Sequence, residues 1–226
     1  MRLIVVRALR WLVARAPEAM RTGSGRLAAF AERLRMSELW LTDVMAYRVA
    51  LARKMGMKVG ERCRFYSLHV ASEAELIEVG DDVIVSGEVM FITHDGAIFT
   101  ALDQFPNVNG HYGRIRIGDG CFLGMRAVIM RGVELGEHCI VAAGAVVMDS
   151  FPPRSVIAGN PATFVVSQPL YLDTKRNHPA TMYDSRYAFP LKYPADALRE
   201  RLANVPFKSP RRRDKLASAG NTPNGS

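Results

Sequence analysis

Hydrophobic positions in the middle of the chain recur every six residues. From residue 117 the sequence divides into six consecutive hexads: IGDGCF, LGMRAV, IMRGVE, LGEHCI, VAAGAV and VMDSFP. The residues that open them are Ile117, Leu123, Ile129, Leu135, Val141 and Val147. A period of six fits neither an amphipathic helix nor a hairpin strand. It predicts a parallel β-solenoid, in which three hexads form one coil and the opening residues fill its axis.

The same register occurs earlier and is then interrupted. Val79, Val85 and Phe91 open hexads in VGDDVIVSGEVMFITHD, and VGERCR at Val59 reads as an isolated further copy. The pattern stops after His94 and resumes at Ile117. Long excursions from a regular scaffold often carry function, so residues 95–114 are predicted to form an inserted loop that builds a pocket.

His94 is the candidate for chemistry because of where it stands. It follows the hexad opener Phe91 by three residues, at a coil corner where side chains point outward. Its neighbours Thr93 and Asp95 are polar and able to orient an imidazole. A single surface histidine usually has no catalytic role. The loop that adjoins His94 is the feature that favours a functional role here.

The two ends lack the hexad pattern and differ in charge. Residues 1–58 hold 12 Lys/Arg against 4 Asp/Glu, whereas residues 59–226 hold 18 of each, so the net charge of +8 belongs to the N-terminal segment. Residues 1–58 are predicted to form two or three helices broken near 21–26, the second capped by Ser37, ended by Gly56 and covering the first coil. Residues 167–226 read as an irregular extension with a short helix at 194–205 and a disordered tail from about 208.

This charge distribution limits the classes of partner that the protein is expected to bind. A neutral solenoid argues against nucleic-acid binding, and the basic segment indicates either contact with an anionic lipid surface or a solvated face. No stretch approaches the roughly 20 apolar residues of a membrane span, because Arg7 and Arg10 interrupt the first apolar run. We expect a cytoplasmic protein, with peripheral contact at the inner membrane surface as an open alternative.

The hexads, His94 and the closing PPRSVIAGNPA (152–162) resemble the hexapeptide-repeat acyltransferases, nearest the sugar and antibiotic O-acetyltransferases. The resemblance covers residues 59–166. It implies a mainly β fold, a left-handed parallel β-helix, flanked here by the helical N-terminal segment and the C-terminal extension. It further implies a homotrimer with active sites between neighbouring prisms, and direct transfer from acetyl-CoA to a sugar hydroxyl or amine of a polysaccharide, glycolipid or nucleotide sugar.

The resemblance also implies roles for individual residues. His94 would be the general base, the backbone N–H of Met125 would bind the oxyanion, and Asp95 would support His94. Coenzyme A would lie along Gly124, Ala142, Ala143, Gly144, Asn160 and Pro161. Acceptor contacts would come from Thr93, Phe105, Asn107, Asn109, His111 and Tyr112.

Three alternatives remain open or are disfavoured. A nucleotide-amino-sugar N-acetyltransferase would use the same base, and a catalytically inactive scaffold would use only the fold. Zinc carbonic anhydrases share the β-helix but need three convergent histidines, and the five histidines here (69, 94, 111, 138 and 178) lack compact spacing, so no metal is expected. Cys63, Cys121 and Cys139 occupy the small slot four residues after an opener and are interpreted as reduced packing residues.

Overall fold

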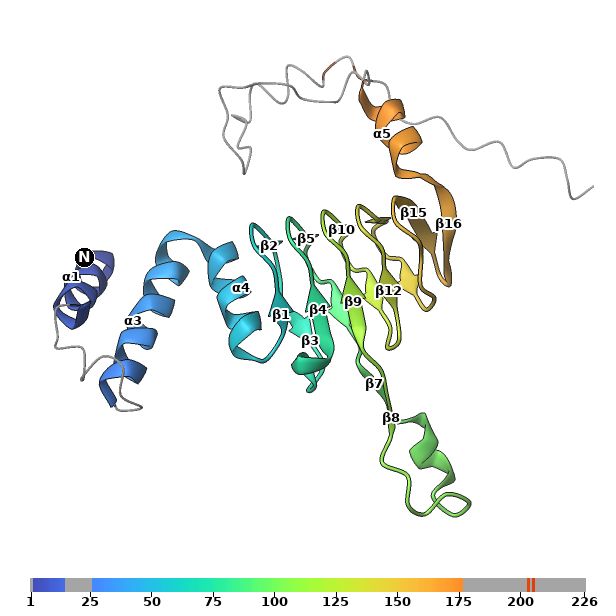
Figure 1. Ribbon diagram of the computed structural model, residues 1–226, viewed down its shortest axis with the longest axis horizontal. Helices are drawn as coiled ribbons and strands as arrows, with labels where there is room; N and C mark the ends of the chain where they lie inside the picture. The colour runs from blue at the N-terminus through green and yellow to red at the C-terminus, as the bar shows by residue number, and fades with distance from the viewer. Residues whose placement is uncertain (1, 15–25, 177–202, 204, 206–226) are drawn as a thin grey trace, which may run out of the picture. The chain divides into compact units, whose positions relative to one another are not determined.

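The computed structural model describes residues 2–14, 26–176, 203 and 205. The chain divides into two compact units, residues 1–172 and 173–226. The first unit begins with α1 (Arg2–Ala14), α3 (Arg26–Thr42) and α4 (Val44–Lys54), and continues as a left-handed parallel β-helix (Figure 1).

Three parallel sheets form the walls of the β-helix. The first sheet contains β1 (Lys58–Val59), β4 (Ile77–Val79), β9 (Ile115–Ile117) and β12 (Glu134–Leu135). The second contains β2 (Arg64–Phe65), β5 (Ile84–Val85), β10 (Phe122–Leu123), β13 (Ile140–Val141), β15 (Ser155–Gly159) and the antiparallel β16 (Ala162–Ser167). The third contains β3 (His69–Val70), β6 (Met90–Phe91), β11 (Val128–Ile129) and β14 (Val146–Val147). In the uninterrupted coils the paired residues are 18 apart, as in Phe122 with Ile140, so three hexads make one coil as predicted.

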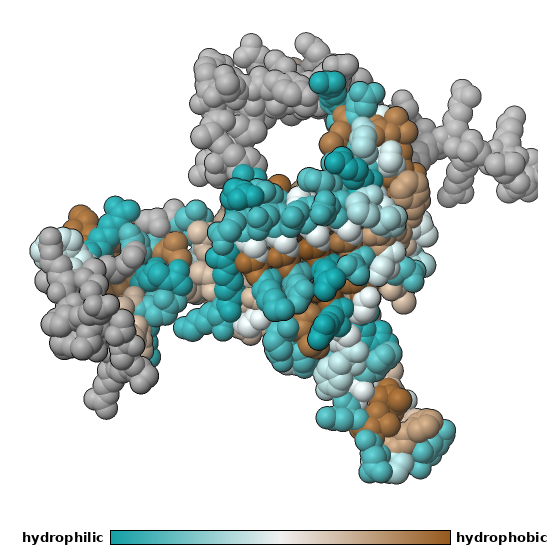
Figure 2. All heavy atoms as spheres, in the orientation of Figure 1, coloured by the Kyte–Doolittle hydropathy of each residue, from teal (hydrophilic) through white to brown (hydrophobic). Residues whose placement is uncertain are grey.

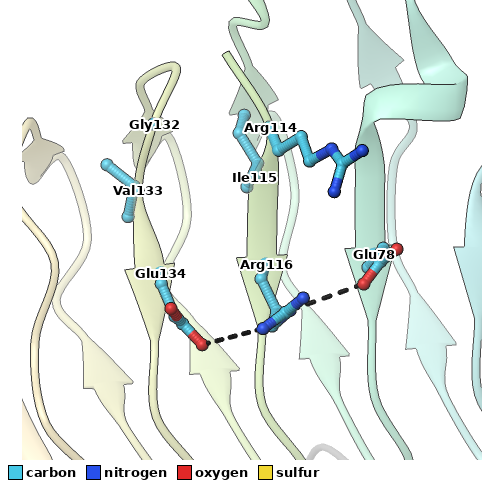
Figure 3. Close-up of a pocket in the computed structure, with 7 residues that line it drawn as sticks. All are labelled: Glu78, Arg114, Ile115, Arg116, Gly132, Val133 and Glu134. Atoms are coloured by element: carbon cyan, nitrogen blue, oxygen red, sulfur yellow. Dashed lines mark hydrogen bonds and ion pairs between the residues drawn. The ribbon is translucent and has the colours of Figure 1, made fainter.

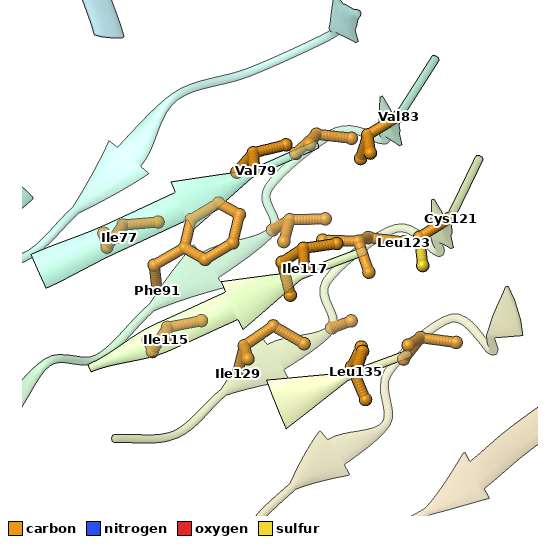
Figure 4. Close-up of a cluster of buried hydrophobic side chains, with 14 of the residues drawn as sticks. Ile77, Val79, Val83, Phe91, Ile115, Ile117, Cys121, Leu123, Ile129 and Leu135 are labelled. Carbon is orange, nitrogen blue, oxygen red and sulfur yellow. The ribbon is translucent and has the colours of Figure 1, made fainter. Parts of the chain in front are cut away.

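The hexad openers fill the axis of the prism. All six openers from Ile117 onward are at most 1% exposed, and they stack in rows down the core (Figure 4). The small slot is filled as expected: Cys121 and Cys139 are fully buried, and their thiols donate to the carbonyls of Gly136 and Pro152 at 3.2 Å. Cys63, Cys121 and Cys139 are free thiols.

Val59 is not an isolated copy of the repeat, as the sequence suggested, but opens a complete first coil. Phe65 is fully buried in that coil, and Val70 pairs with Phe91 in the third sheet. Val70 follows Phe65 by five residues rather than six. The strict period therefore fails there, and the short helix η1 (Ala74–Leu76) takes up the remaining length before β4.

The corner at His94 differs from the other corners. The residue three places after an opener has positive φ at Arg62, Asp82, Glu88, Gly120, Arg126, Gly132, His138 and Gly144. At His94 the chain instead continues into β7 (His94–Asp95), which pairs antiparallel with β8 (His111–Tyr112). Pairs that span this insertion are 38 residues apart instead of 18, as in Ile84 with Phe122, so 20 residues leave the prism, as predicted for 95–114.

We call this excursion the arm (residues 94–112). It is more regular than expected, because the β7–β8 hairpin forms its root and η2 (Ala97–Ala101) follows (Figure 1).

The last of the N-terminal helices, α4, covers the first coil, as predicted. Arg53 of α4 donates from Nε to the carbonyl of Val59 at 3.0 Å and from Nη2 to that of Gly60 at 2.6 Å. The predicted cap at Ser37 is wrong. Ser37 lies inside α3 and donates to the carbonyl of Arg33, whereas Asp43 caps α4 by accepting from the N–H groups of Met45 and Ala46.

The C-terminal part begins with an element that the sequence did not indicate. After the β15–β16 hairpin the chain forms α5 (Gln168–Arg176). The helix predicted at 194–205, the tail from 208 and the break near 21–26 fall wholly or largely outside the described residues.

Candidate active site

His94 is held by a carboxylate from the preceding coil. Its Nδ1 lies 2.8 Å from Oε2 of Glu73, and its side chain remains 42% exposed. A carboxylate can only accept, so Nδ1 carries the proton in this contact and Nε2 is the free, basic nitrogen. This is the geometry of an imidazole prepared to take a proton from a substrate.

Glu73 is fixed as an anion. Hydrogen bonds from Ser72, Thr93 and His94 lower the pKa of the Glu73 carboxyl to about 2. Ser72 Oγ donates to Oε1, and Thr93 Oγ1 donates to Oε2 at 2.7 Å. The ionised carboxylate accepts the hydrogen bond from Nδ1 and so fixes the tautomer and the orientation of the ring.

Sequence reasoning missed Glu73. It precedes His94 by 21 residues and lies in the irregular part of the first coil, so no hexad register aligned the two.

The two polar neighbours of His94 have other partners than expected. The sequence predicted that Thr93 contacts the acceptor. Thr93 is instead fully buried, and its hydroxyl positions Glu73. Asp95 does not support the imidazole: Oδ1 accepts from the N–H of Ala97 at 2.8 Å, and Oδ2 pairs with Arg131 at 3.3 Å. Thr93 and His94 thus share one oxygen of Glu73, whereas Asp95, the second residue of β7, is engaged by the arm and by Arg131.

The arm carries the candidate acceptor residues at two distances from His94. Tyr112 pairs with His94 across the hairpin, with ring centroids 5.9 Å apart. His111 is turned towards Arg131, whose Nη2 is 2.9 Å from its Nδ1. Phe105, Asn107 and Asn109 lie exposed farther out. Exposed apolar side chains gather on this outer part, as Figure 2 shows: Ile98, Phe99, Leu102 and Phe105.

The predicted oxyanion donor lies in a tight turn after β10. The N–H of Ala127 donates to the carbonyl of Gly124 at 3.1 Å, and Arg126 has φ +60, so Met125 is the second residue of the turn. Within the described part of the chain the N–H of Met125 has no acceptor. Its side chain is 55% exposed. The group is thus available to a ligand.

The predicted coenzyme A residues extend from Met125 along one edge of the prism. Ala142, Ala143 and Gly144 repeat the turn one coil later, and the N–H of Gly144 donates to the carbonyl of Met125 at 2.8 Å. Asn160 and Pro161 join β15 to β16 one coil further on, since Val141 pairs with Ile157. One edge of the second sheet therefore brings all these positions together.

Gly124 and Gly144 lie on this edge, and the absence of a side chain has a different physical reason at each. A Cβ on Gly124 would lie 2.5 Å from the N of Ala143, so stacking of the next coil explains the absence of a side chain. Gly144 has φ +72 and nothing within 4 Å of a Cβ position. Gly144 thus leaves backbone accessible to a ligand, whereas Gly124 serves the coil stack.

His94 and Met125 lie on different edges of the same prism. His94 follows β6, at the end of the third sheet, whereas Met125 follows β10, at the end of the second sheet. The structure brings the base together with the arm, and the backbone donor together with the coenzyme A positions. It does not bring the two groups together within one chain.

A hollow lies on the outer face of the first sheet, and Arg114 and Gly132 at one end of it belong to the edge that carries His94. Arg116 crosses it, pairing with Glu78 at 3.4 Å and Glu134 at 3.2 Å; Arg114, Ile115, Gly132 and Val133 complete its lining (Figure 3). Arg116 pairs with both glutamates, so the two carboxylates are already engaged, and we assign no chemistry to the hollow. The described residues contain no group of three or more His, Cys, Asp or Glu side chains placed to hold a metal.

Comparison with known sequences places the chain in a family. Residues 114–148 match the family model described as hexapeptide repeat of succinyl-transferase. Protein CapG from Staphylococcus aureus is 37% identical over 122 residues, which are 53% of this chain and 70% of that protein. The chain belongs to the hexapeptide-repeat acyltransferase family.

Other similarities are narrower. A 2,3,4,5-tetrahydropyridine-2,6-dicarboxylate N-acetyltransferase from Staphylococcus aureus is 35% identical over 81 residues, so the match spans about a third of each protein. Among solved structures, a hexapeptide-repeat acetyltransferase from Vibrio cholerae superposes with a TM-score of 0.46 at 20% identity, covering 73% of this chain and 93% of that one. Family membership confirms the fold predicted from the hexads.

Proposed function

We propose that the protein transfers an acetyl group from acetyl-CoA to a sugar hydroxyl or amine, with His94 as general base. The observation that carries this is the pairing of His94 Nδ1 with ionised Glu73, which leaves Nε2 free on a part-exposed imidazole beside the arm. Membership in an acyltransferase family supports the reaction class.

The chemistry follows from these groups. Nε2 of His94 takes the proton of the acceptor as its oxygen or nitrogen attacks the thioester carbonyl. The N–H of Met125 donates to the oxygen that becomes negative in the tetrahedral intermediate. The C–S bond then breaks, and the imidazolium returns the proton to the leaving thiolate. No covalent enzyme intermediate is required.

A homotrimer is part of this proposal. His94 and Met125 occupy different edges of one prism, so a site containing both needs the His94 edge of one copy beside the Met125 edge of another. Three copies around a threefold axis would close such a heterologous contact into a ring. The arm would then reach the adjacent copy with its exposed apolar side chains.

The acceptor is proposed as a glycan, glycolipid or nucleotide sugar. The proposal includes amine acceptors because one similar protein is named an N-acetyltransferase. The same base serves both, since either nucleophile gives up one proton to Nε2. With such an acceptor the protein would act in polysaccharide assembly; protein CapG, the more broadly matching relative, supports the family and not the acceptor.

We propose a cytoplasmic site of action at the membrane surface. On α1, Ile4, Val5 and Trp11 are 73, 51 and 58% exposed, and the net charge of residues 1–58 is positive. Such a surface fits an anionic interface. No described helix combines the length and apolar content needed to span a bilayer. Co-sedimentation with vesicles containing anionic lipid, absent with neutral vesicles, is the expected result; equal failure with both would contradict it.

One experiment tests the central proposal. Thiol release from acetyl-CoA is measured with galactose, maltose, glucosamine and a UDP-linked amino sugar, for the wild type and His94→Asn. Asparagine keeps a donor towards Glu73 but cannot act as a base. We expect turnover with one acceptor class and its loss in the variant. A wild type that neither binds coenzyme A nor releases thiol would instead support the inactive scaffold.

A further inference from the structure

Arg131 ties the prism to both strands of the arm. It lies in the coil after that of His94, since Phe91 pairs with Ile129. Its Nη2 is 3.3 Å from Oδ2 of Asp95 on β7 and 2.9 Å from Nδ1 of His111 on β8. Asp95 and His111 are opposite each other, and the next pair along the hairpin is His94 with Tyr112. A single guanidinium thus holds the root of the hairpin beside the catalytic base.

We propose that Arg131, Asp95 and His111 form a brace that positions the arm over His94 and so sets the affinity for the acceptor. The brace rests on the proposed function only for its kinetic consequence. Its structural consequence, the order of the arm, is independent of any substrate. Arg131 is a positioning residue in this proposal, because it touches the arm and none of the reacting atoms.

The surroundings of Arg131 favour positioning over stability. Its side chain is 24% exposed, and its Nε is buried with no partner among the described residues. A buried donor without a partner is unfavourable, so removing Arg131 also removes a cost, and Asp95 is exposed enough to be solvated in its absence. Backbone bonds already hold the coil here: Gly113 donates to Thr93, and Gly132 donates to Arg114, each at 2.9 Å. The coil therefore does not need Arg131, whereas the arm does.

The brace also depends on the protonation of His111. A guanidinium has no acceptor, so Nδ1 of His111 must accept, which requires it to be unprotonated. A protonated His111 would place a donor and a second positive charge against Arg131. The charged and titratable groups around it are Asp95 and Arg131 in the brace and His94 and Tyr112 in the adjacent pair, with Glu73 behind His94. His111 therefore belongs to the brace as the acceptor of the Arg131 contact.

Hydrogen exchange of the full chain without ligands tests the brace. In Arg131→Met we expect exchange of peptides covering 97–110 to rise about tenfold, with peptides of β9–β14 unchanged and the thermal midpoint retained. The acceptor KM should rise by about the same factor at unchanged KM for acetyl-CoA. Arg62→Met is the matched control, because Arg62 on the first coil pairs with Asp82 on the second coil and with no residue of the arm.

His111→Asn separates the charge from the contact. The Oδ1 of asparagine can occupy the place of Nδ1 and accept from Arg131 at any pH. Exchange of peptides covering 97–110 should stay at the wild-type level in this variant and rise in His111→Leu, which offers Arg131 no acceptor.

The outcomes judge the brace and the proposed activity separately. The brace would be overturned if peptides of the arm exchanged in Arg131→Met at the wild-type rate. It would also be overturned if the variant lost protection throughout the coils and its thermal midpoint fell. A wild type without transferase activity whose arm still loosens in Arg131→Met would refute the proposed function and leave the brace supported.

Discussion

The edge at His94 and the edge at Met125 occupy the same position in the repeat and offer opposite chemistry. After β10 the chain turns tightly at Met125, and what it presents is a backbone N–H. After β6 the turn is replaced by the arm, and what the chain presents is a side chain backed by Glu73. A regular turn of the repeat can therefore present a backbone donor, as it does at Met125. The fold supplies a positioned side chain where the regularity is broken.

The largest effect is expected from removing the side chain of His94 at its edge of the prism. His94→Asn and His94→Ala should lower kcat by about 10²- to 10⁴-fold, because both remove the base. Thiol release with the responding acceptor measures this, and circular dichroism confirms that both variants fold. Retention of more than a tenth of wild-type kcat in both would exclude His94 as the base.

The next largest effect is expected from removing the backbone N–H of Met125 at the other edge. Proline fits the second position of a turn whose third residue has positive φ, so Met125→Pro removes the N–H with little disturbance. We expect kcat to fall by about 10²- to 10³-fold, with Met125→Leu unchanged as the control.

Mixing the two variants tests whether the edges meet between copies. Trimers reassembled from equal amounts of His94→Ala and Met125→Pro should recover about a quarter of wild-type activity, since one contact in four then unites two intact edges. A mixture that stays inactive would place both groups in one chain and contradict the proposed trimer.

A smaller effect comes from Glu73. Glu73→Gln should lower kcat by about 10- to 100-fold, less than the roughly 10⁴ of a buried triad aspartate, because Glu73 remains 21% exposed. A loss as large as that of His94→Asn would mean that Glu73 does more than orient the imidazole.

The same variant has a pH signature in stability. The pKa of Glu73 in the folded chain is lowered to about 2 from an ordinary 4.5, so its ionised form stabilises the fold above about pH 4.5. That contribution is lost as the pH falls from 4.5 towards 2. Urea midpoints measured across this window should fall less steeply in Glu73→Gln than in the wild type; parallel curves would contradict the assignment.

The smallest effect on activity compares the two glycines. Gly144→Ala should cost about 1–2 kcal/mol of stability through its positive φ. If coenzyme A follows this edge, its KM should also rise by a few-fold. Gly124→Ala should lower stability by about 1–3 kcal/mol through the contact with Ala143, and equal binding defects in both would remove the distinction.

The sequence by itself determined the repeat, and with it the coil, the inward openers, the small slot, the 20-residue insertion and the corner position of His94. These follow because each hexad interacts with the hexads stacked on it, so a local period carries the fold. Its failures occur where the period fails: the first coil was read as an isolated copy because Val70 comes one residue early, and Ser37 was chosen as a cap where Asp43 serves.

Tertiary structure alone decided which groups meet. Glu73 reaches His94 across coils, Thr93 turns inward to hold it, and Asp95 turns to Arg131, whereas the sequence suggested only Thr93 and Asp95 as partners of the imidazole. The separation of His94 from Met125 likewise depends on which sheet each strand joins. Hydrogen bonds between side chains depend on direction over a few ångströms. The hexad period fixes the position of a residue on the prism but not the direction of its side chain once the chain leaves the repeat.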